Sequence, residues 1–426
     1  MVFVCRTAAG ESLRSASALK SLAGVRLFGI AEELDPVFAQ AIQVADVHDG
    51  AQLIAAASEL TLRHGTLHHI VTAQETLLLP VAETCEALNV PGMSSETVRR
   101  TLDKSLLKGT LRRAGIETAA DRIVTSMSDA VRFLSLVGFP IMLKPLRGSG
   151  ALATLMIRSA AELDHALALM QPSPDHPVLA EAFLHGHELC IDTITIDNEP
   201  QLASLCCYYP SIREALENRQ QQWTCIMPRT MDQDIYRDFI EQGLAAVRAL
   251  SVGNAFTHME GFLGDDGKLL GFTDATLRPA GARIGPMLGF AYDVDPYRAW
   301  ARVVVDGCFD GPWQRQYAVG TIFLRGAGSG TIERIDGVEI VNQELDNLIV
   351  DARWPRAGTK KSDTYTGYGY VTVRHSETER VKTALEFIAD TVHITYSHSE
   401  SALEWKERFQ NYRELNRPAW EAGGSQ

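Results

Sequence analysis

The chain has 426 residues, which at roughly 150 residues per domain predicts two or three domains, and its 46% hydrophobic and 22% charged residues are ordinary for a soluble globular protein. Forty basic against 53 acidic residues give a net charge of −13, which argues against a nucleic-acid binder because such proteins present a basic surface to phosphates. The seven cysteines are odd in number and form no C-x-x-C pair, which favours reduced thiols over a disulfide framework or a zinc site. No signal peptide opens the chain and no apolar stretch approaches about 18 residues, so we expect a cytoplasmic protein that spans no membrane.

The first hundred residues alternate short apolar runs with stretches of helical spacing. This order is typical of a small parallel sheet with helices on both faces. No Gly-x-Gly-x-x-Gly stands at a strand–helix junction, so a dinucleotide site is not expected here. The predicted strands are 2–5, 25–30 and 69–72, and the predicted helices are 12–23, 52–64 and 75–88.

The middle of the chain mixes helices with antiparallel hairpins. Ser94, supported by Glu96, is a candidate N-cap for one helix that runs through Lys104 to about Ala114. The segment 213–229 lacks clean periodicity and is interpreted either as a loop over a site or as an exposed connection. The other elements predicted are strands at 121–125, 139–145, 152–158 and 178–182, helices at 128–137, 160–170 and 232–250, and hairpins of 188–196 with 201–207 and of 260–263 with 269–274.

From about residue 313 onward the sequence pattern predicts short strands, followed by helices at 376–389 and about 399–414. The chain therefore divides into three expected units: 1–97, 98–312 and 313–426. The fold class is α/β, in the sense of a multidomain α+β protein.

Lys144 stands at the end of an apolar strand, beside a turn that contains Gly148, Ser149 and Gly150. A lysine there can meet phosphate oxygens while backbone N–H groups of the small residues close over them. No Gly-Lys-Ser/Thr opens a helix, so this is not a Walker loop. Taken alone, the pattern fits an ordinary hairpin turn beside a buried lysine stem equally well.

Other residues strengthen the phosphate interpretation. A second lysine, Lys104, lies forty positions earlier, and the strand end at 181–184 offers backbone groups to an adenine, with Glu188 placed to hold ribose hydroxyls. Further on, Glu260 and Asp274 fall on adjacent antiparallel strands, so their carboxylates can converge on one cation. Hard oxygen ligands shared with a nucleotide's phosphates are what Mg²⁺ prefers.

In this order the motifs resemble the ATP-grasp superfamily, and within it the carboxylate–amine ligases that join amino acids. The resemblance covers nearly the whole chain, from Val90-Pro91-Gly92 through the metal strands to Val294-Asp295 and the β-rich C-terminal unit. It implies an ATP-grasp fold with an N-terminal Rossmann-like domain at 1–97, a core at 98–312 that includes a lid at 118–188, and a C-terminal β-rich domain with a terminal helix.

The resemblance also implies roles for individual residues. Arg278 corresponds to the arginine that faces the transferred phosphate and the substrate carboxylate, Lys144 shares its catalytic role, and His258 and Arg283 are further substrate candidates. The expected metal ligands for Mg²⁺, or for Mn²⁺ in its place, are Glu260, Asp274 and Thr276. The expected ATP contacts are Lys104, Lys144, Arg147, Gly148, Ser149, Gly150, Glu181, Ala182, Phe183, Leu184 and Glu188.

One motif departs from the family pattern. The family reads Glu-x-Asn-x-Arg-Pro-Gly-Gly, whereas this chain has Asp274-Ala275-Thr276-Leu277-Arg278-Pro279-Ala280-Gly281. Threonine offers a neutral hydroxyl where the family uses an amide oxygen, so the second metal position is expected to be weaker or differently built.

The function implied is an ADP-forming ligase that makes an amide bond between small-molecule carboxylate and amine substrates through an acyl phosphate. Two alternatives stay open: a carboxylase that works through carboxyphosphate, and an ATP-binding module that has lost turnover. No nucleic-acid or membrane partner is expected, and the family suggests a homodimer. The sequence names neither the substrates nor the base that deprotonates the amine.

Overall fold

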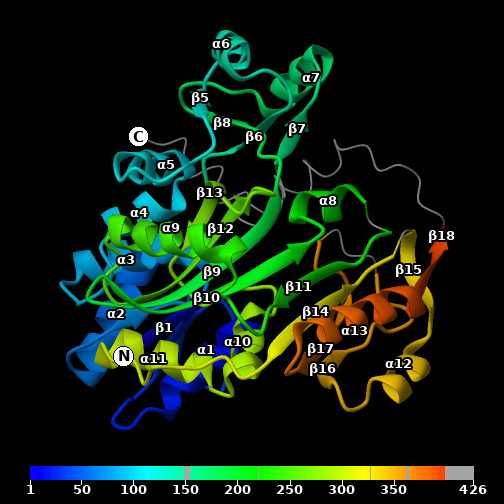
Figure 1. Ribbon diagram of the computed structural model, residues 1–426. Helices are drawn as coiled ribbons and strands as arrows, with labels where there is room; N and C mark the ends of the chain where they lie inside the picture. The colour runs from blue at the N-terminus through cyan, green and yellow to red at the C-terminus, as the bar shows by residue number, and fades with distance from the viewer. Residues whose placement is uncertain (148–153, 219, 327, 361–363, 399–426) are drawn as a thin grey trace.

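The computed structural model describes residues 1–147, 154–218, 220–326, 328–360 and 364–398 (Figure 1). Gly148, Ser149 and Gly150 of the predicted phosphate loop, and the predicted helix at 399–414, lie outside these ranges. None of the described helices is long and apolar enough to cross a membrane.

The N-terminal unit is a parallel sheet with the strand order β3-β2-β1-β4. Alternate residues of β1 point to opposite faces, so Val2 and Val4 pack on α2 and α3, while Phe3 packs on α1 and α11. The parallel sheet predicted from the strand–helix alternation is confirmed. The sequence reading missed β3, because this short segment lacks an apolar run. The elements are β1 (Val2–Cys5), α1 (Gly10–Ser21), β2 (Phe28–Ala31), β3 (Gln40–Gln43), α2 (Gly50–His64), β4 (Ile70–Val71), the 3₁₀ turn η1 (Glu75–Leu77) and α3 (Leu78–Ala87).

The predicted helix from 94 to 114 is wrong in one respect: it is two helices, α4 (Ser95–Leu102) and α5 (Lys104–Arg113). Asp103 between them is extended, with φ −85° and ψ 111°, and its side chain accepts hydrogen bonds from the N–H groups of Ser105 and Leu106. Aspartate stabilises a helix start more than a helix interior, so the chain restarts there. The break lets the Lys104 N–H donate to the carbonyl of Leu146 at 3.0 Å, which joins the start of α5 to the end of the strand that carries Lys144.

A small antiparallel sheet with the order β5-β8-β6-β7 stands above the rest of the molecule (Figure 1). Its helices begin at serine caps, Ser126 and Ser159, and cover one face, where Leu143 and Ala180 join the core. The residues that alternate with these, Lys144 and Glu181, therefore point to the other face. The elements are β5 (Asp121–Val124), α6 (Met127–Val137), β6 (Ile141–Pro145), β7 (Leu155–Ile157), α7 (Ala160–Met170) and β8 (Val178–Ala182).

The largest sheet has the order β13-β12-β9-β10-β11-β14-β17-β16, with antiparallel neighbours throughout. Both predicted hairpins are confirmed as β9–β10 and β12–β13. One face packs on α4, α5 and α9, and the other packs on α10. The strands are β9 (His187–Ile196), β10 (Glu199–Tyr209), β11 (Trp223–Met227), β12 (Ala255–Leu263), β13 (Leu269–Thr276), β14 (Ala318–Leu324), β16 (Ile349–Arg353) and β17 (Gly369–His375).

The segment 213–229 contributes most of a short helix and an inner strand of this sheet, so the irregular structure predicted for it is wrong, although Arg213 and Glu214 do line the cavity of the candidate active site. The sheet runs on from the expected core into residues beyond 313 through the pairing of β11 with β14. The three domain boundaries stay predictions. The remaining elements are α8 (Ile212–Glu217), α9 (Asp234–Leu250), α10 (Ile284–Tyr292), α11 (Pro296–Asp306), α12 (Val338–Glu344), α13 (Thr378–Thr391), and the pair β15 (Ser329–Asp336) and β18 (His393–His398).

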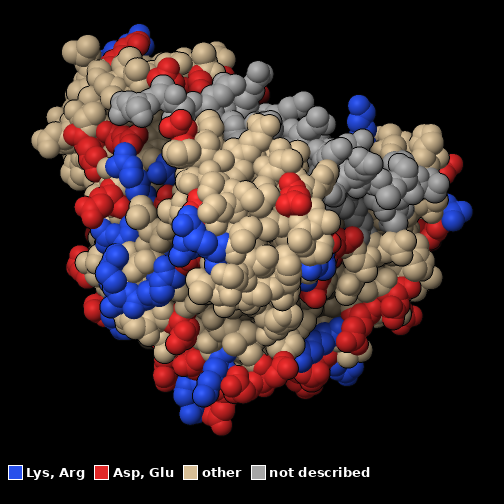
Figure 2. Space-filling model, turned by 90° about the horizontal axis from the view of Figure 1, so that it is seen from above, with Lys and Arg blue, Asp and Glu red and all other residues tan. Residues whose placement is uncertain are grey.

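The surface seen from above shows basic and acidic side chains interspersed around a broad area of other residues (Figure 2). On the left of this view, lysine and arginine side chains gather in one group (Figure 2).

Candidate active site

A cavity of about 710 Å³ lies where the small sheet meets the edge of the large one. Its size suits a nucleotide-sized ligand. The sequence-predicted residues that line it are Lys104, Lys144, Arg147, Glu181, Ala182, Phe183, Leu184, Glu188, Glu260 and Asp274. The structure thus brings together, from α5, both sheets and the loops between them, the described residues predicted to contact ATP.

Two lysines and one carboxylate form a buried cluster on the wall of this cavity. Glu181 pairs with Lys144 through Oε2 at 2.7 Å and with Lys108 through Oε1 at 2.6 Å. Lys108 is fully buried, and the sequence reading missed it. The available signal was its spacing: Lys108 lies four residues after Lys104, which places both on one face of α5.

The pKa values of both Lys144 and Glu181 are lowered in this cluster. Burial, together with the charges of Lys108 and Lys104 and only partly opposed by Glu181, lowers the pKa of Lys144 to about 8. Although burial opposes the shift, Lys108 and Lys144 lower the pKa of Glu181 to about 2. Glu181 was predicted to be part of the adenine segment, but its side chain instead neutralises the lysines.

Lys104 connects this cluster to the predicted metal strands. Its Nζ donates to Asp274 Oδ2 at 2.8 Å. Although burial opposes the shift, the charge of Asp274 raises the pKa of Lys104. Lys104 therefore presents a cation between the cavity and β13.

The predicted convergence of Glu260 and Asp274 is confirmed by the register, in which the two residues lie directly opposite each other on β12 and β13. Both carboxylates line the cavity. Thr276 lies two residues after Asp274 on β13 and therefore on the same face of the strand. Its buried Oγ1 has no hydrogen-bond partner among the described residues. Two carboxylates beside an unsatisfied hydroxyl oxygen form a donor set that fits a hard cation such as Mg²⁺.

Glu188 lies on β9, opposite Phe262 of β12. Its Oε2 accepts from the Ile212 N–H at 2.6 Å. Burial and the nearby charge of Glu260 raise the pKa of Glu188 to about 8. At neutral pH this carboxyl group is therefore largely protonated and can donate as well as accept a hydrogen bond, which suits a hydroxyl ligand.

A second cavity of about 140 Å³ adjoins the first and shares Glu260 and Asp274 with it. Arg278 lines it and donates to Glu75 Oε2 at 2.6 Å and to the carbonyl of Pro279 at 2.8 Å. Glu75 lies 203 residues earlier in the chain, in the N-terminal unit, and the sequence reading did not select it. The second cavity is also lined by Tyr208, Ile212, Trp223, His258, Ala275, Thr276, Gly281, Ala282, Ile284 and Tyr365.

His258 lies on the same face of β12 as Glu260 and contacts two carboxylates. Its Nδ1 lies 3.0 Å from Asp192 Oδ1 and its Nε2 lies 3.4 Å from Glu260 Oε1. Although burial opposes the shift, the charge of Asp192 raises the pKa of His258 well above its ordinary value. Asp192 was not among the predicted site residues.

Among the predicted site residues that the structure describes, Arg283 is the one that lines neither of these cavities. It precedes α10 in a left-handed conformation, with φ 65°, and forms an ion pair with Asp351. Its guanidinium stacks over the ring of Tyr370, with Cζ 4.1 Å from the ring centroid. Arg283 lines a different cavity near α1, so placing it with Arg278 as a substrate residue is corrected.

Known ligases are similar to this chain in sequence and in structure. No protein-family model matches the chain. An alanine–anticapsin ligase of Bacillus subtilis is 24% identical over 254 residues, which cover 53% of this chain and 51% of that ligase. The chain spans about half the length of the curated relatives it matches. The crystal structure of an L-amino acid ligase from Bacillus licheniformis superposes with a TM-score of 0.76 at 18% identity, covering 93% of this chain and 98% of that one.

The chain has the ATP-grasp fold. Its homologues are ATP-grasp ligases, so the predicted resemblance to that superfamily is confirmed. A further ATP-grasp structure, N5-carboxyaminoimidazole synthetase from Staphylococcus aureus complexed with ADP, has a TM-score of 0.68 at 16% identity and covers 91% of this chain and 96% of that one.

Proposed function

We propose that this ATP-grasp protein is an ADP-forming carboxylate–amine ligase that joins amino acids or amino-acid-like molecules through an acyl phosphate. The observation that carries the proposal is the pair of adjoining cavities. One is lined by buried lysines and is large enough for a nucleotide, and the other holds Arg278. They meet at Glu260 and Asp274, where a phosphoryl group would pass from one to the other.

In the larger cavity, Lys144 and Lys104 would bind the phosphates of ATP, and the 182–184 backbone would face the adenine. Lys144 is preorganised by Glu181, which holds its Nζ at 2.7 Å, so little side-chain entropy remains to be lost on binding. Arg147 lies at the cavity edge with its Nε 3.8 Å from Asp103 Oδ2. It would close over the phosphates.

Glu260 and Asp274 would hold Mg²⁺, with Thr276 available as a neutral oxygen donor. When bound, the ion would neutralise charge on the phosphates. Lys104, now paired with Asp274, would then exchange that carboxylate for a phosphate oxygen.

The carboxylate substrate would enter the smaller cavity and take the place of Glu75 on Arg278. Its oxygen attacks the γ-phosphorus of ATP, the bond between that phosphorus and the β,γ-bridging oxygen breaks, and ADP leaves. Lys144 and Arg278 stabilise the charge on the transferred phosphoryl group. The product is an acyl phosphate.

The amine of the second substrate then attacks the acyl carbon. The C–O bond to phosphate breaks, inorganic phosphate leaves, and the amine gives up one proton as the amide forms. The small sheet above the cavity would exclude water, which would otherwise hydrolyse the acyl phosphate.

The test measures ADP release from ATP and Mg²⁺ with pooled amino acids, with and without bicarbonate. We expect release that requires two amino acids and ignores bicarbonate. It should be abolished in Lys144→Ala and retained in Lys268→Ala, a matched change of an exposed lysine in the β12–β13 turn. Release that requires bicarbonate instead of a second amino acid would identify a carboxylase and refute the proposal.

A further inference from the structure

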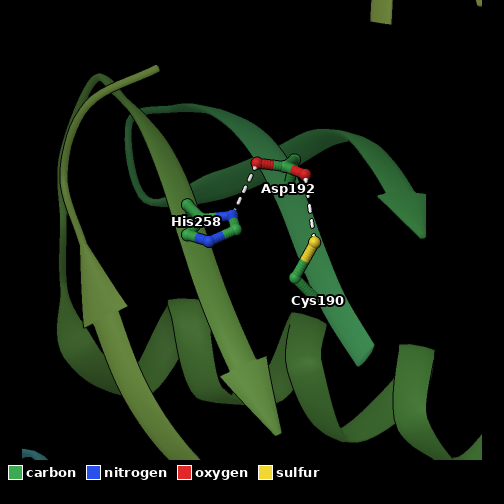
Figure 3. A group of neighbouring side chains, drawn as sticks. All are labelled: Cys190, Asp192 and His258. Atoms are coloured by element: carbon green, nitrogen blue, oxygen red, sulfur yellow. Dashed lines mark hydrogen bonds and ion pairs between the residues drawn. The ribbon is translucent and has the colours of Figure 1, made fainter. Parts of the chain in front are cut away.

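Three side chains with three different donor atoms converge beside the proposed magnesium position (Figure 3). Cys190 and Asp192 are alternate residues of β9 and so share a face, and His258 lies directly opposite Asp192 on β12. Cys190 Sγ is 3.7 Å from Asp192 Oδ2, and Asp192 Oδ1 is 3.0 Å from His258 Nδ1. One sulfur, one oxygen and one nitrogen donor all lie within 4.8 Å of one another.

The spacing matches tetrahedral metal coordination. Metal–ligand bonds of 2.0–2.3 Å in a tetrahedron separate neighbouring donor atoms by roughly 3.3–3.8 Å. The two separations lie at or near this range but end on different oxygens of Asp192, so the carboxylate would rotate to present one oxygen to the ion. A water molecule would supply the fourth ligand.

The donor types select the metal. A thiolate, an imidazole and one carboxylate suit a borderline-soft ion such as Zn²⁺ or Co²⁺, whereas Mg²⁺ prefers oxygen ligands alone. We propose that Cys190, Asp192 and His258 form a binding site for a divalent ion of the Zn²⁺ class, separate from the Glu260–Asp274 pair. This revises the expectation that none of the cysteines takes part in a zinc site.

The same residues without a metal would form only an imidazolium–carboxylate ion pair with a buried thiol beside it. Burial raises the pKa of Cys190 well above its ordinary value, so metal binding must displace a proton from the thiol. Proton release when metal is added would therefore distinguish a metal site from a metal-free ion pair beside a thiol.

The site is placed to influence the proposed magnesium ligand. A metal on His258 Nδ1 fixes the ring proton on Nε2, which lies 3.4 Å from Glu260 Oε1 and would donate to it. That hydrogen bond, together with the added positive charge, would weaken Mg²⁺ binding at Glu260. This effect rests on the proposed function, whereas the metal site itself does not.

The test is a titration of the full chain with Co²⁺ in the presence of excess Mg²⁺, which occupies the all-oxygen site. We expect a thiolate-to-cobalt charge-transfer band that saturates at one equivalent and disappears when Zn²⁺ is added. The band should be lost in Cys190→Ser and kept in Cys308→Ser, since Cys308 is the exposed cysteine among the seven.

Absence of the band in the wild-type protein, or its persistence in Cys190→Ser, would overturn the proposal. If Cys190→Ser does not fold, Asp192→Asn serves instead because it keeps the thiol and removes one charged ligand. We expect it to need at least about tenfold more Co²⁺ for half-saturation, and unchanged affinity would overturn the proposal.

Where ligase activity is found, equimolar Zn²⁺ should raise the Mg²⁺ concentration for half-maximal activity in the wild type but not in Cys190→Ser. An equal Zn²⁺ effect in both proteins would contradict the site, and the optical band decides the matter even without activity.

Discussion

The buried cluster of Lys108, Glu181 and Lys144 lets us predict how much stability the protein loses when the carboxylate is removed. Glu181→Gln keeps the size of the side chain and removes the one carboxylate that pairs with both buried lysines, at 2.6 Å and 2.7 Å. Lys108 has no exposed surface and Lys144 is 7% exposed, so water cannot replace the lost partner. We expect the free energy of unfolding to fall by about 3–5 kcal/mol, the usual cost of leaving a buried charge unpaired.

A second route to the magnitude gives the same size. A fully buried lysine without a counter-charge escapes the penalty by losing its proton. Moving from an unfolded pKa of about 10.4 to neutrality near pH 7.4 costs roughly 1.4 kcal/mol for each of about three pH units, which is an upper limit for Lys144 because its pKa is already about 8 in the wild type. Because the folded variant then binds fewer protons than the unfolded chain, its deficit shrinks as the pH rises from 7 toward the unfolded pKa.

Urea unfolding, followed by tryptophan fluorescence at two pH values, measures the effect. Glu241→Gln, an exposed change on α9, is the matched control and should stay within about 0.5 kcal/mol of the wild type. Adding Lys108→Met to Glu181→Gln should recover part of the loss, because it removes one of the two unpaired charges. A Glu181→Gln protein within about 1 kcal/mol of the wild type at neutral pH, or a deficit that does not shrink with rising pH, would refute the reasoning.

Three further predictions concern ligand binding. Because burial lowers the pKa of Lys144 to about 8 and the protonated form binds phosphate, ATP affinity measured by calorimetry should fall as the pH rises through 8. Lys144→Arg should remove this pH dependence, since arginine keeps its proton, and a wild-type affinity that is flat to pH 9 would count against the assignment. Thr276→Asn supplies the amide oxygen of the family motif and should lower the Mg²⁺ concentration for half-maximal ADP release several-fold; an increase would show that Thr276 is not near the ion. Arg278→Lys loses two-point contact with a carboxylate and should raise KM for the carboxylate substrate about tenfold or more, while Arg248→Lys on the surface of α9 should not; equal effects would indicate a general loss of stability.

Local sequence determined the elements and the part of the site that lies within single hairpins. Lys144 at a strand end needs only the apolar run before it, and the opposition of Glu260 to Asp274 follows from the turn that joins β12 to β13. Strand alternation then places His258 on the face of Glu260. For this reason the ATP-grasp resemblance, the described residues that line the larger cavity and the opposition of the two carboxylates could be predicted from the sequence.

Tertiary structure decided which charges meet, because the partners come from segments far apart in the chain. Glu181 meets Lys108 across 73 positions, from β8 to α5, and Arg278 meets Glu75 across 203. Asp103 caps α5 locally, but the partner of the Lys104 N–H, the carbonyl of Leu146, is supplied by the fold. Helical spacing and alternation say which way a side chain points from its own element, but not which element lies opposite. The packing of the sheets makes that choice. It determines the pKa of Lys144, the contact of His258 with Asp192 and the separation of Arg283 from the site.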